Sequence, residues 1–308
     1  MTDASSTKPT ALTRACPVCG GSESAPFLRK NGLQIVSCIA CGMLYANPVP
    51  REMASGGFYN DAGDEYLTAD KLAGDYADVR FNRELRHFHR HCPHGSVLDV
   101  GCSSGGFLYQ LNKRFPNSYE VLGTDVSRAP LEHAEKMRIP VVRDNFLTHS
   151  FPEQFDAVTF WAVMEHLFEP QKFLRKAVSI LKPGGLCFIL VPNMKSLAVR
   201  LLGVKYRYIF PEHINYFTPH TLSDFAGREL EVFEMRSTHF NPIVIWRDFR
   251  GGPRDIPRSE RSELLKQTTA CKQSRWLLPV QAAYGATEWV LGKLRLADNL
   301  LIVGRKER

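Results

Sequence analysis

Short apolar runs alternate with amphipathic stretches through the middle of the chain. The apolar runs are short enough to be buried strands and are bounded by glycine, proline or aspartate. They cover residues 96–100, 119–124, 140–143, 155–160 and 186–191. Between them, residues 127–138 and about 170–181 have apolar positions at helical spacing, and Ser127 is a suitable N-cap. This alternation predicts an α/β fold, in which helices cover both faces of a parallel sheet.

A helical pattern also covers residues 70–92, where charged residues are interleaved with apolar ones. Four histidines, His87, His89, His91 and His94, lie close together at its end. A spacing of two residues does not place side chains on one helix face. We therefore expect a solvated or mixed helix end rather than a metal site.

A glycine turn follows the first strand of the predicted sheet. A dinucleotide-binding turn requires the pattern G-x-G-x-x-G, but Ser103 stands at its second glycine position, between Gly101 and Gly105. Asp99 lies just before the turn, where a carboxylate would repel a pyrophosphate but suits a ligand with ammonium and sulfonium groups. Ligands of such sheets bind beyond the carboxyl ends of the strands. Asp125, at the end of the second strand, can accept both hydroxyls of a ribose there.

The ordered motifs at residues 97–102, Asp125, 156–158 and 181–185 resemble those of class I S-adenosylmethionine-dependent methyltransferases. The resemblance covers roughly residues 75–240 and the final strand, and Ser103 replaces the usual second glycine. It implies S-adenosylmethionine as the cofactor, and a nucleotide-binding fold with another ligand is the alternative. The cofactor-binding residues expected are Asp99, Gly101, Cys102, Ser103, Gly105, Phe107, Asp125, Val126, Asp144, Asn145 and Trp161.

The same resemblance implies the rest of the fold. It is a Rossmann-like, seven-stranded sheet that ends in an antiparallel hairpin, for which residues 232–239 and 299–305 are the candidate strands. Residues 241–297 are then a helical insertion before the last strand.

Two C-x-x-C pairs precede this region. Cys16 and Cys19 form the first pair, and Cys38 and Cys41 the second, which is the ligand spacing of a zinc ribbon. Four thiolates fill a tetrahedral site, so the Zn²⁺ is expected to be structural rather than catalytic. Two disulfides are the alternative, and they are disfavoured because no export signal is recognised at the N-terminus.

These patterns divide the chain into four parts. We expect a disordered tail at 1–14, a zinc ribbon at 15–50, a helical linker or substrate cover at 51–95, and the methyltransferase domain at 96–308. Tyr59, Tyr66 and Tyr76 of the cover are expected on the substrate side.

Methyl transfer from a sulfonium is a direct displacement that often needs a general base. His166 follows the fourth strand and is interpreted as a base or as a wall of the cofactor pocket. Residues 208–218 are similar to the Glu-His segment of zinc-ribbon sugar C-methyltransferases, which implies His213 as the base and Glu212 as the group that orients it. The alternative for His166 is a buried histidine at a helix start that is satisfied by hydrogen bonds. The alternative for Glu212 and His213 is a structural pair that closes the loop over the site.

The amino-acid composition narrows the class of protein and its location. Hydrophobic residues make up 44% of the 308 residues and charged residues 23%, as in ordinary globular proteins. The sequence has neither an apolar run long enough to span a membrane nor a signal peptide, so a cytoplasmic location is expected. Most of the net charge of +7 comes from the C-terminal fifth. Residues 246–297 are interpreted as a lid, a homodimer surface, a membrane contact for a lipid-linked substrate, or an insertion packed on its own domain.

The sequence therefore predicts a methyltransferase for a small polar metabolite. The expected substrate is a sugar, a nucleotide-sugar or a related hydroxylated or keto compound of bacterial polysaccharide or secondary-metabolite biosynthesis, methylated on oxygen or carbon. One alternative is an RNA base methyltransferase, which is disfavoured because few aromatic stacking platforms accompany the basic residues. Another is a cofactor-binding protein without turnover. DNA is not expected as a partner.

Overall fold

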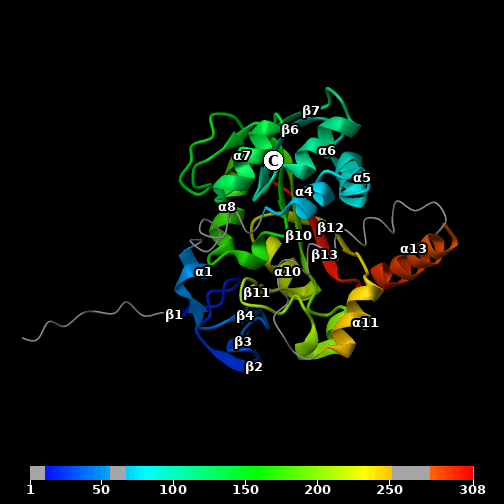
Figure 1. Ribbon diagram of the computed structural model, residues 1–308. Coiled ribbons are helices and arrows are strands. Elements are labelled where there is room, and N and C mark those ends of the chain that lie inside the picture. The colour runs from blue at the N-terminus through cyan, green and yellow to red at the C-terminus, as the bar shows by residue number, and fades with distance from the viewer. Residues whose placement is uncertain (1–10, 56–66, 252–277, 308) are drawn as a thin grey trace, which may run out of the picture.

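The computed structural model describes residues 11–55, 67–251 and 278–307. Its centre is a seven-stranded sheet of order β12-β13-β10-β9-β6-β7-β8 (Figure 1). The strands are β6 (Gly95–Val100), β7 (Tyr119–Thr124), β8 (Val141–Val142), β9 (Phe155–Trp161), β10 (Leu181–Pro192), β12 (Glu231–Thr238) and β13 (Asn299–Arg305). Only β13 runs antiparallel to its neighbours β10 and β12, so the predicted Rossmann-like sheet with a final antiparallel hairpin is confirmed.

Helices cover both faces of this sheet, and its central strands are therefore apolar on both sides. Leu98 and Val158 belong to the hydrophobic cluster on one face, and Val97 and Ala157 belong to the cluster on the other. The helices that follow strands are α6 (Gly106–Arg114), α7 (Arg128–Lys136), α8 (Pro170–Ile180) and α10 (Pro219–Ala226). The motif at 181–185 lies inside β10, where the pairing with β9 shifts between Leu181 and Leu186.

The N-terminal strands form a small sheet that shares a strand with the larger domain. Its strands are β2 (Ser24–Lys30), β3 (Leu33–Cys38), β4 (Leu44–Ala46) and β11 (Asn215–Tyr216), in the order β11-β4-β3-β2. Because β11 follows the candidate base His213 directly, the ribbon is physically continuous with the candidate site.

The tail expected to be disordered at 1–14 is ordered at its end, where residues 11–14 are described. β1 (Ala11–Leu12) pairs with β5 (Val49–Pro50). The Arg14 guanidinium donates to the carbonyl oxygens of Phe168 at 2.9 Å and Ile214 at 2.6 Å. Local sequence pattern could not indicate these contacts, because the partners lie more than 150 residues away in the sequence.

The helix expected over residues 70–92 is two helices, which is a second correction. After the short α1 (Arg51–Ser55), the described chain forms α4 (Ala69–Asp75) and α5 (Asn82–His91). The break lies at Phe81, whose φ of 59° is in the left-handed region. α5 buries Leu85 and Phe88 in the cluster that also holds Phe107 of α6, whereas α4 lies against the glycine turn. One straight helix could not make both contacts. Tyr59 and Tyr66 lie outside the described residues.

The predicted insertion contains helices in the parts that the structure describes. α11 (Pro242–Arg250) packs against α9 (Leu197–Leu202), which is followed by the short helix η2 (Gly203–Lys205), and α13 (Leu278–Lys293) leads to the final strand. The basic residues at 254–275 and Trp276 lie outside the described residues, so the interpretations of this segment stay predictions. Among the described helices, none is long and apolar enough to cross a membrane.

A buried ion pair fastens the insertion to the domain. Asp248 of α11 accepts hydrogen bonds from the Arg207 backbone N–H at 3.0 Å and from its guanidinium, with Nε at 2.9 Å, and both side chains are 2% exposed. Removing one partner of such a pair leaves an uncompensated buried charge.

We therefore expect Asp248→Ala to lower the free energy of unfolding by about 3–5 kcal/mol, measured by urea denaturation. Lys113→Ala is the control, because its ion pair with Asp78 is exposed and should contribute at most about 1 kcal/mol. Equal effects of the two substitutions would contradict this account of the insertion.

Candidate active site

The turn after β6 is in direct contact with the loop after β9. Gly101 has a φ of 76°, and a Cβ built at this residue would lie 2.5 Å from Cγ2 of Val163. No L-residue fits that space, and few adopt that backbone angle. Gly101 therefore lets the candidate cofactor turn approach Val163, which lies three residues before His166 in the sequence, at the carboxyl edge of the sheet.

Two of the predicted carboxylates lie at this edge in different environments. Asp99 is buried and accepts a hydrogen bond from the Thr159 hydroxyl at 2.6 Å, and burial raises its pKa to about 7. Asp125 is partly exposed and accepts from the backbone N–H groups of Ser103 and Ser127, both at 2.8 Å. A carboxylate has about four acceptor sites. Asp125 can thus hold the glycine turn and still accept two ribose hydroxyls.

Ser103, the departure from the family pattern, also has a left-handed backbone, with a φ of 50°. Serine can adopt this angle at some energetic cost. Its hydroxyl oxygen accepts from Nζ of Lys71 at 3.2 Å, and its N–H is held by Asp125. Hydrogen bonds to its hydroxyl and to its N–H thus stabilise the left-handed backbone of Ser103.

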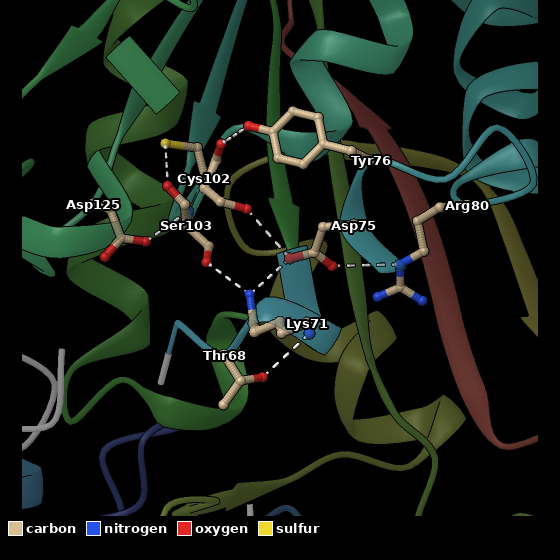
Figure 2. Close-up of polar contacts among 9 residues, drawn as sticks. Thr68, Lys71, Asp75, Tyr76, Arg80, Cys102, Ser103 and Asp125 are labelled. Carbon is tan, nitrogen blue, oxygen red and sulfur yellow. Dashed lines mark hydrogen bonds and ion pairs between the residues drawn. The ribbon is translucent and has the colours of Figure 1, made fainter. Parts of the chain in front are cut away.

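Helix α4 and the residue after it contact the turn, and Figure 2 shows the side chains of Lys71, Asp75 and Tyr76 beside it. Asp75 accepts from Lys71 Nζ at 2.7 Å and from the Ser104 hydroxyl at 3.3 Å. Tyr76 donates its hydroxyl proton to the Ser104 carbonyl, so this tyrosine reaches the glycine turn rather than an open substrate side. Lys71 and Asp75 could not be predicted from the sequence pattern, because only the break between α4 and α5 brings them there.

The other expected cofactor residues divide into a buried and an exposed group. Cys102 and Phe107 are buried and support the turn from the core, and Gly105 begins α6 with a φ of 77°. Val126, Asp144 and Asn145 are exposed beyond β7 and β8, where an adenine ring could lie against them. Trp161 packs on Phe107 with ring centroids 4.9 Å apart. Its indole nitrogen is buried and makes no hydrogen bond to the described residues. These features fit S-adenosylmethionine, and the assignment stays a prediction.

The structure brings the two candidate bases together. The rings of His166 and His213 are 4.7 Å apart between centroids and nearly perpendicular. The Nδ1 atom of His166 lies 2.8 Å from the carbonyl oxygen of Glu212, and Nδ1 of His213 lies 3.0 Å from that of Tyr208. A carbonyl oxygen only accepts, so Nδ1 carries the proton in both rings. In the neutral state, Nε2 of each ring is then a proton acceptor.

Glu165 completes this group and was missed by the sequence analysis. It is 1% exposed, its Oε2 atom has no hydrogen-bond partner among the described residues, and burial raises its pKa to about 8. One ligand atom each of Glu165, His166 and His213 lies within 4.8 Å of the others. Glu212 was expected to orient His213 through its carboxylate. In the structure, its backbone carbonyl accepts a hydrogen bond from His166. The sequence feature that could have indicated Glu165 is its position as a carboxylate within an apolar run.

Backbone contacts fasten the loops that hold these side chains. The Ile214 N–H donates to the Glu165 carbonyl at 2.8 Å. The Asn215 amide donates to the carbonyls of Met164 and Leu167, both at 2.7 Å. Since Asn215 also belongs to β11, the ribbon sheet sets the position of both histidine loops.

The four N-terminal cysteines converge as their spacing predicts. Their sulfur atoms lie within 4.8 Å of one another, and the Cys16–Cys41 and Cys19–Cys38 sulfur pairs are each 3.5 Å apart. A disulfide needs about 2.05 Å, whereas a tetrahedral zinc site with Zn–S of about 2.3 Å has sulfur atoms about 3.8 Å apart. The geometry fits zinc rather than disulfides.

Comparisons with known proteins agree with this geometry. A family model described as a methyltransferase domain matches residues 75–229. The chain is 31% identical over 164 residues to a ubiquinone biosynthesis O-methyltransferase of Proteus mirabilis, across 48% of this chain and 66% of that protein. It is 32% identical over 162 residues to the protein of the same name in Ruegeria pomeroyi, across 48% and 64%. The match thus spans just under two thirds of these relatives.

Solved structures share the fold at low sequence identity. A SAM-dependent methyltransferase of Thermotoga maritima is 16% identical, with a TM-score of 0.51, and the similarity covers 82% of this chain and 99% of the other. The methyltransferase in complex with the Trm112 activator of Haloferax volcanii is 16% identical, with a TM-score of 0.52 and coverage of 81% and 98%. At this identity the similarity supports the fold alone.

The Gly101–Val163 contact can be tested by a pair of substitutions. Gly101→Ala should lower the affinity for S-adenosylhomocysteine at least tenfold, measured by isothermal titration calorimetry, because the new methyl group would push the β9 loop away. Gly184→Ala is the matched control: its φ is 75°, but an added Cβ would meet nothing within 4 Å. Equal losses in both variants would mean that backbone strain, and not the contact, matters.

The raised pKa of Glu165 predicts how stability depends on pH. The folded protein retains a proton that the unfolded chain loses near 4.5, so this residue's contribution to stability is lost as pH rises from about 4.5 to about 8. Glu165→Gln removes the effect. The difference in unfolding free energy between variant and wild type should therefore shift in favour of the variant over this range, measured by urea denaturation at several pH values. Glu169→Gln, at an exposed position nearby, should show no such trend.

Proposed function

Because this chain belongs to the methyltransferase domain family, we propose that it transfers a methyl group from S-adenosylmethionine to a hydroxyl oxygen of a small polar metabolite. The expected class, an S-adenosylmethionine-dependent methyltransferase, is confirmed at the level of the family. The oxygen acceptor, the substrate and the roles of individual residues belong to the proposal.

One observation carries the proposal. The candidate cofactor turn at Gly101 touches Val163, and the chain then continues into the short helix η1 (Met164–His166), whose histidine contacts His213. A sulfonium methyl group held over the turn and an acceptor beside the histidines would therefore face each other at one sheet edge. Methyl transfer needs this proximity of donor, acceptor and base.

Side chains of this protein remove the proton from the acceptor hydroxyl. When bound, S-adenosylmethionine supplies a methyl group on a sulfonium, so that an O–CH₃ bond forms while the C–S bond breaks and leaves a neutral thioether. An imidazole Nε2 of the histidine pair takes the hydroxyl proton. The carbonyls of Glu212 and Tyr208 keep the Nδ1–H of each ring in place, which fixes both the ring orientation and the accepting nitrogen.

Buried carboxyl groups complement this proton transfer. Glu165 lies in the same cluster, so a positive charge that develops on an imidazole favours its ionised form. Asp99 is similarly poised beneath the turn, and an ammonium or sulfonium group above it would favour its carboxylate. The site thus offers negative charge where the donor and the protonated base need it.

The nature of the acceptor rests on two features. The relatives are named as O-methyltransferases of ubiquinone biosynthesis, which supports an oxygen acceptor. The family match at 75–229 excludes the ribbon and the insertion, so we infer that these segments select the substrate. A sugar, a nucleotide-sugar or another hydroxylated metabolite remains the proposed class, and the zinc ion is proposed to be structural.

A methyl-transfer assay tests the proposal. Purified protein is incubated with radiolabelled S-adenosylmethionine and, separately, with hydroxylated aromatic acceptors, sugar nucleotides and total RNA. Label should enter a small hydroxylated acceptor as a methyl ether. Label found only in RNA would overturn the proposal, and binding of the cofactor without any transfer would favour the non-catalytic alternative.

Substitutions then identify the base. One of the two variants, His213→Ala or His166→Ala, should remove the nitrogen that accepts the hydroxyl proton. That variant should lower kcat by about 10²-fold or more, with little change in the affinity for S-adenosylhomocysteine. His220→Ala is the control, because this histidine is exposed on α10. If both candidate variants turn over like wild type, the histidine pair is not the base.

A further inference from the structure

We propose that His87, His91 and Glu234 form a second metal site, distinct from the ribbon and from the histidine pair, that binds Zn²⁺ or a similar transition-metal ion. The two histidines belong to α5 and the glutamate to β12, so an ion would connect the cover segment to the edge strand of the main sheet. The proposal does not depend on the proposed function.

The side chains already point at one another. Nε2 of His91 lies 2.7 Å from Oε2 of Glu234, and Nε2 of His87 lies 3.5 Å from the same oxygen. One ligand atom of each residue lies within 4.8 Å of the other two. Histidines four residues apart share one helix face, which is how helices present paired imidazoles to zinc.

The buried nitrogen atoms of this group are poorly satisfied by hydrogen bonds. Both ring nitrogens of His87 are buried and make no hydrogen bond to the described residues. Nε2 of His91 is also buried, and its 2.7 Å contact with the Glu234 carboxylate does not have the geometry of a hydrogen bond. Buried polar atoms without hydrogen bonds are rare, because each costs desolvation energy without compensation. A metal ion would satisfy the two Nε2 atoms at once.

The two separations that involve Glu234 require only a small adjustment. With metal–ligand bonds of about 2.0–2.1 Å, tetrahedral ligand atoms lie about 3.3 Å apart. The His87–Glu234 separation already has this size, and the His91–Glu234 separation must widen by roughly 0.6 Å. The side chains of His91 and Glu234 are 22% and 18% exposed, so an ion can enter and water can occupy the fourth position.

The surroundings favour a transition metal. Imidazole ligands select zinc and its neighbours over magnesium or calcium, which prefer oxygen. Phe188 and Phe233 border the group with ring centroids 6.4 Å from His87 and 5.5 Å from His91, respectively. The Arg236 guanidinium contacts the other carboxylate oxygen of Glu234, Oε1, and so leaves Oε2 to the metal.

The other two histidines of the cluster do not take part. His89 stacks on Phe115 at 3.7 Å between ring centroids, and its Nδ1 lies 2.7 Å from the Tyr119 hydroxyl oxygen. His94 is exposed beyond the end of α5. Histidines two residues apart do not share a helix face, whereas His87 and His91, four residues apart, do. Their acidic partner Glu234 comes from a distant strand.

Metal counting on the full-length protein tests the proposal. After saturation with ZnCl₂ and removal of excess metal, wild type should retain two zinc ions per chain by inductively coupled plasma mass spectrometry, one in the ribbon and one here. His91→Ala and Glu234→Gln should each retain one, and His94→Ala, the matched control on the same segment, should retain two. Added zinc should also raise the Tm of wild type above that of the two site variants.

Cobalt substitution tells the two sites apart. The difference between the Co²⁺ spectra of wild type and His91→Ala should contain d–d bands without the thiolate charge-transfer band, which the ribbon alone supplies. A single ion per wild-type chain, with thiolate ligands only, would overturn the proposal whether or not the variants fold. So would an equal metal content of His91→Ala and His94→Ala. In either case, the group is a histidine–carboxylate brace without metal.

Discussion

The close approach of the β6 turn to the β9 loop is the contact on which the rest of the site depends. It exists because Gly101 has no side chain and adopts a positive φ, so that Val163 can fill the space where a Cβ would lie. Asp99 lies just before this contact, and His166 follows it by a few residues. In the proposed mechanism, this contact keeps a donor at one strand end and a base on the next within reach of a shared acceptor.

The second histidine reaches the same place through the ribbon. β11 adds a strand to the ribbon sheet directly after His213, and Asn215 ties this segment to the loop that carries His166. Arg14, whose pKa burial lowers to about 10, stays charged near neutral pH and donates to carbonyls on both sides of the junction. The N-terminal module therefore acts as a brace for the histidine loops as well as a candidate metal site.

Burial sets the electrostatics of the sheet edge. Asp99 and Glu165 lie out of contact with water, which raises the pKa of each, whereas Asp125 is partly exposed and is held by two backbone amides. Carboxyl groups of this kind respond strongly to a nearby cation, because little solvent screens the interaction. The proposed mechanism uses this sensitivity twice, at Asp99 for the sulfonium and at Glu165 for an imidazolium.

The amino-acid sequence alone was enough to predict most of the order of strands and helices, the glycine turn with its two aspartates, and the four-cysteine set. Each of these depends on residues close together in the chain, whose spacing reflects a local turn, a strand end or a ligand pair. It also named His166 and His213, but not their contact. That contact is visible only in the tertiary structure. The same is true of the break between α4 and α5, of the hydrogen bonds of Arg14, and of the contacts of His87 and His91 with Glu234. These arrangements join residues that lie tens to hundreds of positions apart in the sequence. Local periodicity does not indicate which of these distant side chains will contact one another in the folded protein.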